Sequence, residues 1–105
     1  MHSMDNLKKL PRFSNLCPDA TSAFWAYDEV ALGDGAIPKK YKELMAVVVA
    51  LTTQCAYCIE VHGQRAVDAG ATEQELVEAV HVASAVRAGG AITHGTHVLK
   101  TNSAA

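Results

Sequence analysis

The chain is short of charged residues and has no long apolar run. Only 19% of its 105 residues are charged while 50% are hydrophobic, which is a low charge content for a small monomer. The formal net charge is −2, so the composition indicates no nucleic-acid or other polyanionic partner. No apolar run approaches the roughly 20 residues that a transmembrane helix requires. The sequence therefore predicts a protein that neither binds nucleic acid nor enters a membrane.

Cysteine is also scarce, and its number is odd. Three cysteines suit a reducing compartment, with one redox pair and one spare thiol. The first residues, Met-His-Ser-Met-Asp-Asn, lack the apolar segment of a signal peptide. We therefore expect a cytoplasmic protein in which Cys17, next to Pro18, is the spare thiol.

Strand patterns, repeats and low-complexity tracts are missing as well, and helical spacing dominates. The length suggests one domain. The sequence predicts an all-α fold, a compact bundle of about five helices over residues 18–105, preceded by an irregular arm over residues 1–17. The run from Leu44 to Leu51 carries no charge. The helix that contains it is expected to be central and buried, and to form with the next helix a pair that carries Cys-x-x-Cys.

Helix boundaries follow from prolines, glycines and capping residues. Pro18 and Pro38 stand at first-turn positions, where the missing N–H costs nothing. Thr72 and Glu75 form a capping box, and Gly89-Gly90 should end the helix that follows it. These signals predict helices over residues 18–32, 38–53, 55–69, 73–88 and 91–100, followed by a fraying tail over residues 101–105.

The most informative stretch runs from Glu43 to His62. Cys55 and Cys58 are three residues apart and His62 is four residues beyond Cys58, so a helix would place all three on one face. Cys55 would lie at the helix N-terminus, where free N–H groups and the macrodipole favour a thiolate. A Cys-x-x-Cys pair in this position is typical of redox-active thiols with a lowered pKa.

Glu43 lies twelve residues before Cys55, so it reaches this site only if the chain reverses. Thr52-Thr53-Gln54 is a suitable corner, because threonine is poor inside helices and good at their ends. If the next helix packs back antiparallel, Glu43 lies roughly 16 Å and His62 roughly 13 Å from the corner. A carboxylate beside an uncharged run needs a hydrogen-bond partner. We therefore expect Glu43 to pair with His62.

The pattern Glu43–x11–Cys55–x2–Cys58–x3–His62 resembles the alkyl hydroperoxidase D-like (AhpD-like) family, within the carboxymuconolactone decarboxylase superfamily. The resemblance continues through residues 70–76 to Gly89-Gly90 and so covers roughly the C-terminal two thirds. In one departure, Tyr57 stands where the alkyl hydroperoxidases carry a second histidine. The decarboxylase branch lacks the cysteine pair, which argues against lactone decarboxylation.

This resemblance implies a thiol-dependent peroxidase of the alkyl hydroperoxidase or peroxiredoxin type. In it Cys58 is the attacking thiolate, Cys55 is the resolving thiol, and His62 with Glu43 is the proton relay. Its substrates are a hydroperoxide and a dithiol reductant of the lipoyl or thioredoxin type, and it uses no cofactor and no metal. Members of the family form trimers or hexamers. The stretch Ala79–Val86 agrees, because a helix that is apolar on nearly all sides must be covered on both.

Other interpretations stay open. The cysteines would also fit a buried apolar pair, or half of a zinc site completed by histidines. The main alternative function is a non-enzymatic oligomeric redox sensor or disulfide relay; a third is decarboxylase-like acid–base chemistry by Glu43 and His62. Candidates for lining a substrate pocket are Tyr57, His94 and His97. Tyr57 would either donate a hydrogen bond to a bound peroxide or simply pack.

Overall fold

The computed structural model describes residues 2–100, and it is helical throughout. No strand occurs in that range, which confirms the predicted all-α class. No helix in the same range has the length and apolarity to cross a membrane. The predicted tail over residues 101–105 lies outside the described residues. The elements in chain order are η1 (Met4–Lys9), α1 (Pro11–Leu16), α2 (Pro18–Leu32), α3 (Lys39–Thr53), α4 (Ala56–Asp68), α5 (Glu73–Gly95) and η2 (Thr96–Val98).

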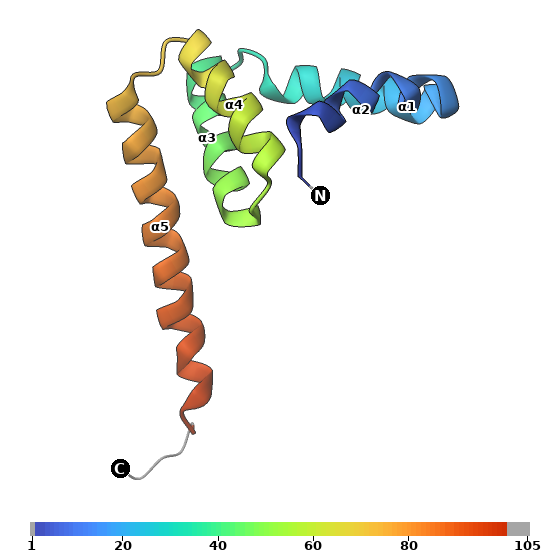
Figure 1. Cartoon of the computed structure of the whole chain (residues 1–105). Helices are drawn as coiled ribbons and strands as arrows, with labels where there is room; N and C mark the ends of the chain where they lie inside the picture. The colour runs from blue at the N-terminus through green and yellow to red at the C-terminus, as the bar shows by residue number, and fades with distance from the viewer. Residues whose placement is uncertain (1, 101–105) are drawn as a thin grey trace.

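Helices α3 and α4 form an antiparallel hairpin at the centre of the chain (Figure 1). The corner is Gln54, whose left-handed backbone (φ 58°, ψ 41°) reverses the direction. Thr52 and Thr53 precede it, and their hydroxyls donate back to the carbonyl of Val49 at 2.9 Å. The predicted corner is therefore confirmed. It brings the end of the uncharged run next to the cysteine motif.

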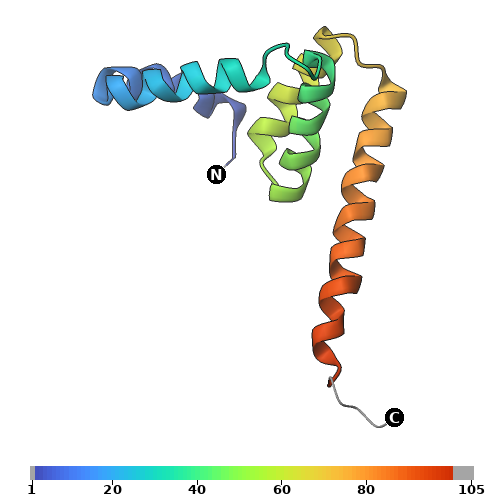
Figure 2. The same cartoon turned by 180° about the vertical axis from the view of Figure 1, so that it is seen from behind.

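Helix α5 runs alongside α3 and extends beyond the hairpin, as both views show (Figures 1 and 2). Thr72 and Glu75 form the predicted capping box at its start. Glu75 also pairs with Lys40 of α3 at 2.8 Å. Further along, the Arg87 guanidinium donates to the Thr52 carbonyl at 2.9 Å, at the hairpin corner. These polar contacts fix α5 against both ends of α3.

The predicted break at Gly89-Gly90 was wrong. α5 is continuous through both glycines to Gly95, so residues 91–100 are not a separate fifth helix. A glycine lowers helix propensity by about 1 kcal/mol but leaves helical dihedral angles available. The Thr93 hydroxyl donates to the Gly89 carbonyl at 3.0 Å. The tendency of Gly89 and Gly90 to end the helix is thus outweighed. Helix α5 continues to Gly95, and η2 follows directly.

The arm over residues 1–17 was predicted to be irregular, but residues 4–9 and 11–16 within it are helical. Ser3 caps η1 by accepting the Asp5 N–H at 3.3 Å, and Pro11 occupies the first turn of α1. Cys17 has a non-helical backbone and separates α1 from α2. The short segments η1 and α1 contain no buried residue. Their helical form follows from local capping and proline rather than from a core, and the sequence analysis gave these signals too little weight.

The single chain is extended rather than compact. Its radius of gyration is 18.5 Å and its longest dimension is 63 Å. A compact domain of this length has a radius of gyration of about 13 Å. Helices α2 and α5 project from the hairpin in different directions (Figure 2). Few apolar side chains are buried within the chain, namely Val47, Ala50, Ala66, Ala71 and Ala83.

Candidate functional site

Cys55 and Cys58 are joined in a disulfide at the start of α4. Their Cα atoms are 5.3 Å apart, within the usual range for a disulfide. Cys55 is the N-cap residue of α4, and its sulfur accepts the backbone N–H of Cys58 at 3.3 Å. A helix N-terminus carries unpaired N–H groups and a partial positive charge. Once the pair is reduced, this position favours the thiolate form of Cys55.

Glu43 and His62 form the predicted acid–imidazole pair. Glu43 Oε2 lies 2.7 Å from His62 Nδ1, and the Glu43 residue is fully buried. The carboxylate accepts the Nδ1 hydrogen, because Nδ1 is the ring nitrogen that faces it. This arrangement leaves Nε2 as the free nitrogen of the ring. Glu43 Oε1 is buried without a hydrogen-bond partner.

The hairpin aligns these groups in one direction along α4. Cys55 caps the helix, Cys58 lies in its first turn, and His62 follows one turn later on the same face. Glu43, on α3, meets His62 across the hairpin. The arrangement places a disulfide one helical turn from an imidazole whose orientation is fixed by a buried carboxylate. It is suited to moving electrons at sulfur and protons at nitrogen.

Tyr57, between the two cysteines, contacts the N-terminal segment. Its hydroxyl accepts a hydrogen bond from the Asn6 amide at 2.9 Å, and its ring meets the ring of His2 edge-to-face at 4.5 Å between centroids. The sequence analysis missed these neighbours. They are 51 and 55 residues away in the chain, and no local pattern could have indicated them.

His94 and His97, the other candidates for a substrate pocket, are not brought to the cysteines. Their rings lie 5.9 Å apart, centroid to centroid, and both residues are exposed. Arg87 meets the hairpin corner, and His94 is seven residues further on, about 10 Å beyond along a straight helix. Within one chain they therefore form a separate histidine pair past the end of the hairpin.

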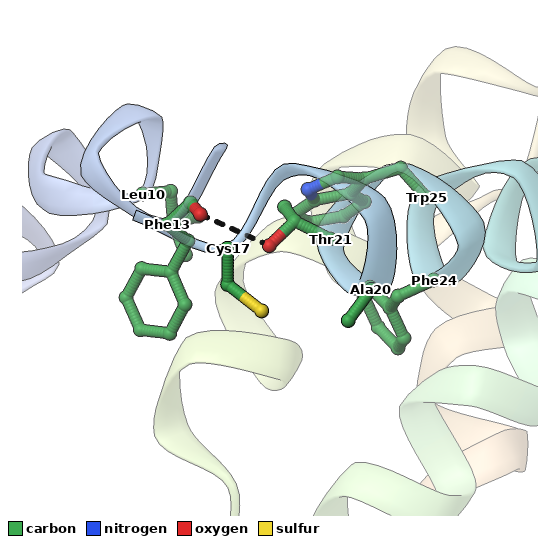
Figure 3. Close-up of a pocket in the computed structure, with 7 residues that line it drawn as sticks. All are labelled: Leu10, Phe13, Cys17, Ala20, Thr21, Phe24 and Trp25. Atoms are coloured by element: carbon green, nitrogen blue, oxygen red, sulfur yellow. Dashed lines mark hydrogen bonds between the residues drawn. The ribbon is translucent and has the colours of Figure 1, made fainter. Parts of the chain in front are cut away.

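Among the cavities formed by the described residues, two are of interest here, and neither is lined by Cys55 or Cys58. One, of about 380 Å³, has Glu43 in its wall together with Lys39 and Arg65. The other, of about 430 Å³, lies between α1 and α2 and is almost entirely apolar. Figure 3 shows the second cavity, with Cys17 between Phe13 and the α2 side chains. Its lining consists of Leu10, Phe13, Cys17, Ala20, Thr21, Phe24 and Trp25.

Cys17 is a free, exposed thiol on this apolar surface, well away from the disulfide in sequence. The described residues form no cluster that could bind a metal ion. In residues 2–100, no three side chains among His, Cys, Asp and Glu converge as possible metal ligands. The histidines considered for a zinc site therefore do not gather around the cysteine pair.

Sequence comparison finds relatives over most of the chain. The model of the carboxymuconolactone decarboxylase family matches residues 18–101. A protein of Paracoccus denitrificans, described as uncharacterized protein 4 in cox locus, is 46% identical over 77 residues, which are 73% of this chain and 69% of that protein. An uncharacterized protein of Cupriavidus necator is 35% identical over 65 residues, which are 62% of this chain and 58% of that protein.

Solved structures give the same picture. An apo carboxymuconolactone decarboxylase family protein from Legionella pneumophila has a TM-score of 0.74 and 35% identity, covering 78% of this chain and 73% of that one. A protein from Methanobacterium thermoautotrophicum has a TM-score of 0.77 and 30% identity, covering 84% of this chain and 99% of that one.

Fold and site together define an all-helical protein with a Cys-x-x-Cys pair at disulfide distance. The chain belongs to the carboxymuconolactone decarboxylase family. This membership confirms the resemblance that the spacing of Glu43, Cys55, Cys58 and His62 indicated.

Proposed function

We propose that the protein is a thiol-dependent peroxidase of the AhpD-like type. The observation that carries the proposal is the 2.7 Å pair of Glu43 and His62, one helical turn from a sulfur of the Cys55–Cys58 disulfide. A cysteine pair that only locked a helix corner would not need a buried carboxylate and an oriented imidazole beside it. Burying the Glu43 carboxylate is costly unless it has a hydrogen-bond partner, and His62 is that partner.

In the reduced enzyme, His62 Nε2 takes the proton of the Cys58 thiol, while Glu43 holds the ring by accepting from Nδ1. The Cys58 thiolate attacks the terminal, hydrogen-bearing oxygen of the hydroperoxide and the O–O bond breaks. The departing alkoxide takes the proton from His62 and leaves as an alcohol. Cys58 is then a sulfenic acid.

Cys55 resolves this intermediate. Its thiolate attacks the Cys58 sulfur, a disulfide forms, and the sulfenic hydroxyl takes a proton from solvent and leaves as water. The N-cap position of Cys55 supports this role, because the helix N-terminus stabilises a thiolate at neutral pH.

A dithiol donor of the lipoyl or thioredoxin type returns the pair to the reduced state by thiol–disulfide exchange. The more stable thiolate is the better leaving group in such exchange. The donor is therefore expected to attack Cys58 and to displace Cys55. A second thiol of the donor then releases the mixed disulfide, so two electrons pass to the enzyme and the donor becomes a disulfide.

The test is a peroxide-consumption assay with lipoyl and thioredoxin donors on the wild type, Cys58→Ser and Cys17→Ser. Cys58→Ser should abolish turnover because no attacking sulfur remains. Cys17→Ser is the matched control, and it should retain activity because Cys17 lies outside the site. A single stoichiometric oxidation without turnover would refute the peroxidase and favour a redox sensor.

A further inference from the structure

The N-terminal segment reaches across the chain to the first turn of α4, which lies between the two cysteines. Tyr57 is a residue of that turn, and both its ring and its hydroxyl contact the segment. Asn6 donates to its hydroxyl at 2.9 Å, and His2 packs against its ring at 4.5 Å. A segment that sits on Tyr57 stands beside the disulfide, since Tyr57 directly precedes Cys58.

The rest of this segment has little to hold it there. η1 has no buried residue, and its ion pair between Lys8 and Asp5 is internal to it. The contacts of the segment to Tyr57, a hydrogen bond and a ring contact, favour a docked position but do not make it permanent. Segments with so few buried contacts open locally far more easily than a core helix does.

We propose that residues 2–9, called here the N-terminal lid, close over the first turn of α4, between Cys55 and Cys58, through Asn6 and His2 on Tyr57, and that they restrict access for bulky reagents. Cys55, Tyr57 and Cys58 are all half-buried with the lid in place. A small dithiol reaches the sulfurs past the docked lid, whereas a protein dithiol must displace it. The lid thus sets which reductants and which hydroperoxides are admitted.

This inference rests on the proposed function only in assuming that the disulfide exchanges electrons with outside reagents. The test starts from the oxidised full-length protein. It compares the rate of disulfide reduction by dithiothreitol, a small dithiol, with the rate by reduced thioredoxin, a folded protein dithiol. The quantity reported is the ratio of the thioredoxin rate to the dithiothreitol rate.

The variants are Asn6→Ala and Tyr57→Phe, which remove opposite ends of the same hydrogen bond. Lys9→Ala is the matched control, because Lys9 is exposed in the same segment and has no ion pair with any of residues 2–100. Losing one neutral hydrogen bond shifts a docking equilibrium by about two- to tenfold. Asn6→Ala and Tyr57→Phe should raise the ratio by that amount, and Lys9→Ala should leave it unchanged. The effect of the double variant should be smaller than the sum of the two single effects, since both changes delete the hydrogen bond that Asn6 and Tyr57 share.

An unchanged ratio in both single variants would overturn the lid. An equal rise in both rates would also overturn it. That result would mean that the first turn of α4 had become more mobile, and not that the lid excludes large reagents. Neither rate depends on peroxide. If the ratio rises as expected and the peroxide assay fails, the peroxidase proposal is lost and the lid stands. If turnover is normal and the ratio is unchanged, the reverse holds.

Discussion

At the scale of single residues, the decisive feature is that Glu43 is buried completely at the edge of an uncharged run. Its Oε2 has a partner in His62 and its Oε1 has none. Such a group is rarely neutral for stability, because an unpaired buried oxygen costs about 1–3 kcal/mol. A buried Glu43 with an unpaired oxygen is understandable if the carboxylate orients the His62 imidazole for proton transfer.

The two cysteines have different surroundings, although they are only three residues apart. Cys55 lies at the N-cap and accepts a backbone N–H, whereas Cys58 lies one turn before His62. The first environment stabilises a thiolate passively, and the second offers a base to remove a proton. The division into a resolving and an attacking thiol, which the family resemblance implies, agrees with this difference.

If Glu43 and His62 activate Cys58, His62→Ala should slow its reactions near neutral pH and spare them at high pH. An unassisted thiol of pKa near 8.5 is only about 3% ionised at pH 7, so the loss there should reach up to about thirtyfold. Above pH 9 hydroxide ionises the thiol without help. Glu43→Gln should act in the same direction but more weakly, since it only orients and charges the ring.

The measurement is the pH profile of Cys58 alkylation by iodoacetamide, with every variant carrying Cys17→Ser and Cys55→Ser so that one thiol remains. His81→Ala is the matched control, because His81 is an exposed histidine on α5. Profiles that superimpose for His62→Ala and the parent would show that the pair is structural.

At the scale of elements, the hairpin of α3 and α4 builds the site and α5 braces it. α5 is anchored at its first turn by Glu75, which pairs with Lys40 and with its own cap residue Thr72. The hydrogen bond from Lys40 is the largest cause that lowers the pKa of Glu75 from its ordinary value of 4.5, and the same pair raises the pKa of Lys40. The anchor therefore depends on pH.

The effect of pH on stability follows from the direction in which the pKa of Glu75 is shifted. A carboxyl whose pKa is lowered on folding adds stability above its unfolded value of about 4.5, and loses that stability as the pH falls through the folded pKa. Glu75→Gln should therefore flatten the fall in the midpoint of urea unfolding between about pH 5 and pH 3. Because both side chains are partly solvated, the effect is expected to be small and to shrink with added salt.

Glu78→Gln serves as the control, since Glu78 is exposed on the same helix and has no ion pair. It should leave the acid-side slope unchanged. Parallel slopes for the wild type and Glu75→Gln would show that the pair contributes nothing to the stability of the fold.

At the scale of the whole molecule, the single chain exposes more surface than a compact monomer of the same mass would. Its accessible area is 8133 Å². A compact monomer of this mass exposes about 5,700 Å². The difference between these two areas, about 2,400 Å², is in the range of the area buried in obligate subunit interfaces. The apolar cavity between α1 and α2 and the exposed valines and isoleucine of α5 supply suitable surfaces, including Val82, Val86 and Ile92.

We therefore propose that the protein is a homo-oligomer, and the family resemblance implies a trimer or a hexamer. Light scattering at micromolar concentration should give three or six times the chain mass of 11.1 kDa. Val86→Lys should shift the mass downward, because Val86 is 68% exposed in the single chain and a lysine there would be buried without a partner in an interface.

Gln74→Lys makes a matched change at an exposed polar position on the same helix and should leave the mass unaltered. A stable monomer of the wild type would contradict the assembly. It would also require a different packing of α2 and α5 in solution, since the extended chain buries too few apolar groups to be stable alone.

The sequence by itself determined the local features: an all-α class, the capping box at Thr72, the corner before Cys55, and the meeting of Glu43 with His62. Each depends on spacing and capping, and those act over a few residues or across one short corner. The sequence was misleading at Gly89-Gly90 and in residues 4–16, where weak helix-forming and helix-breaking propensities compete and differ by about 1 kcal/mol.

Only the tertiary structure decided what the distant segments do. It placed Asn6 and His2 on Tyr57, left His94 and His97 beyond the hairpin, and spread α2 and α5 apart. These outcomes depend on how whole helices pack over separations of tens of residues. No residue pattern encodes such packing directly, because it is set by the sum of many small contacts rather than by one spacing.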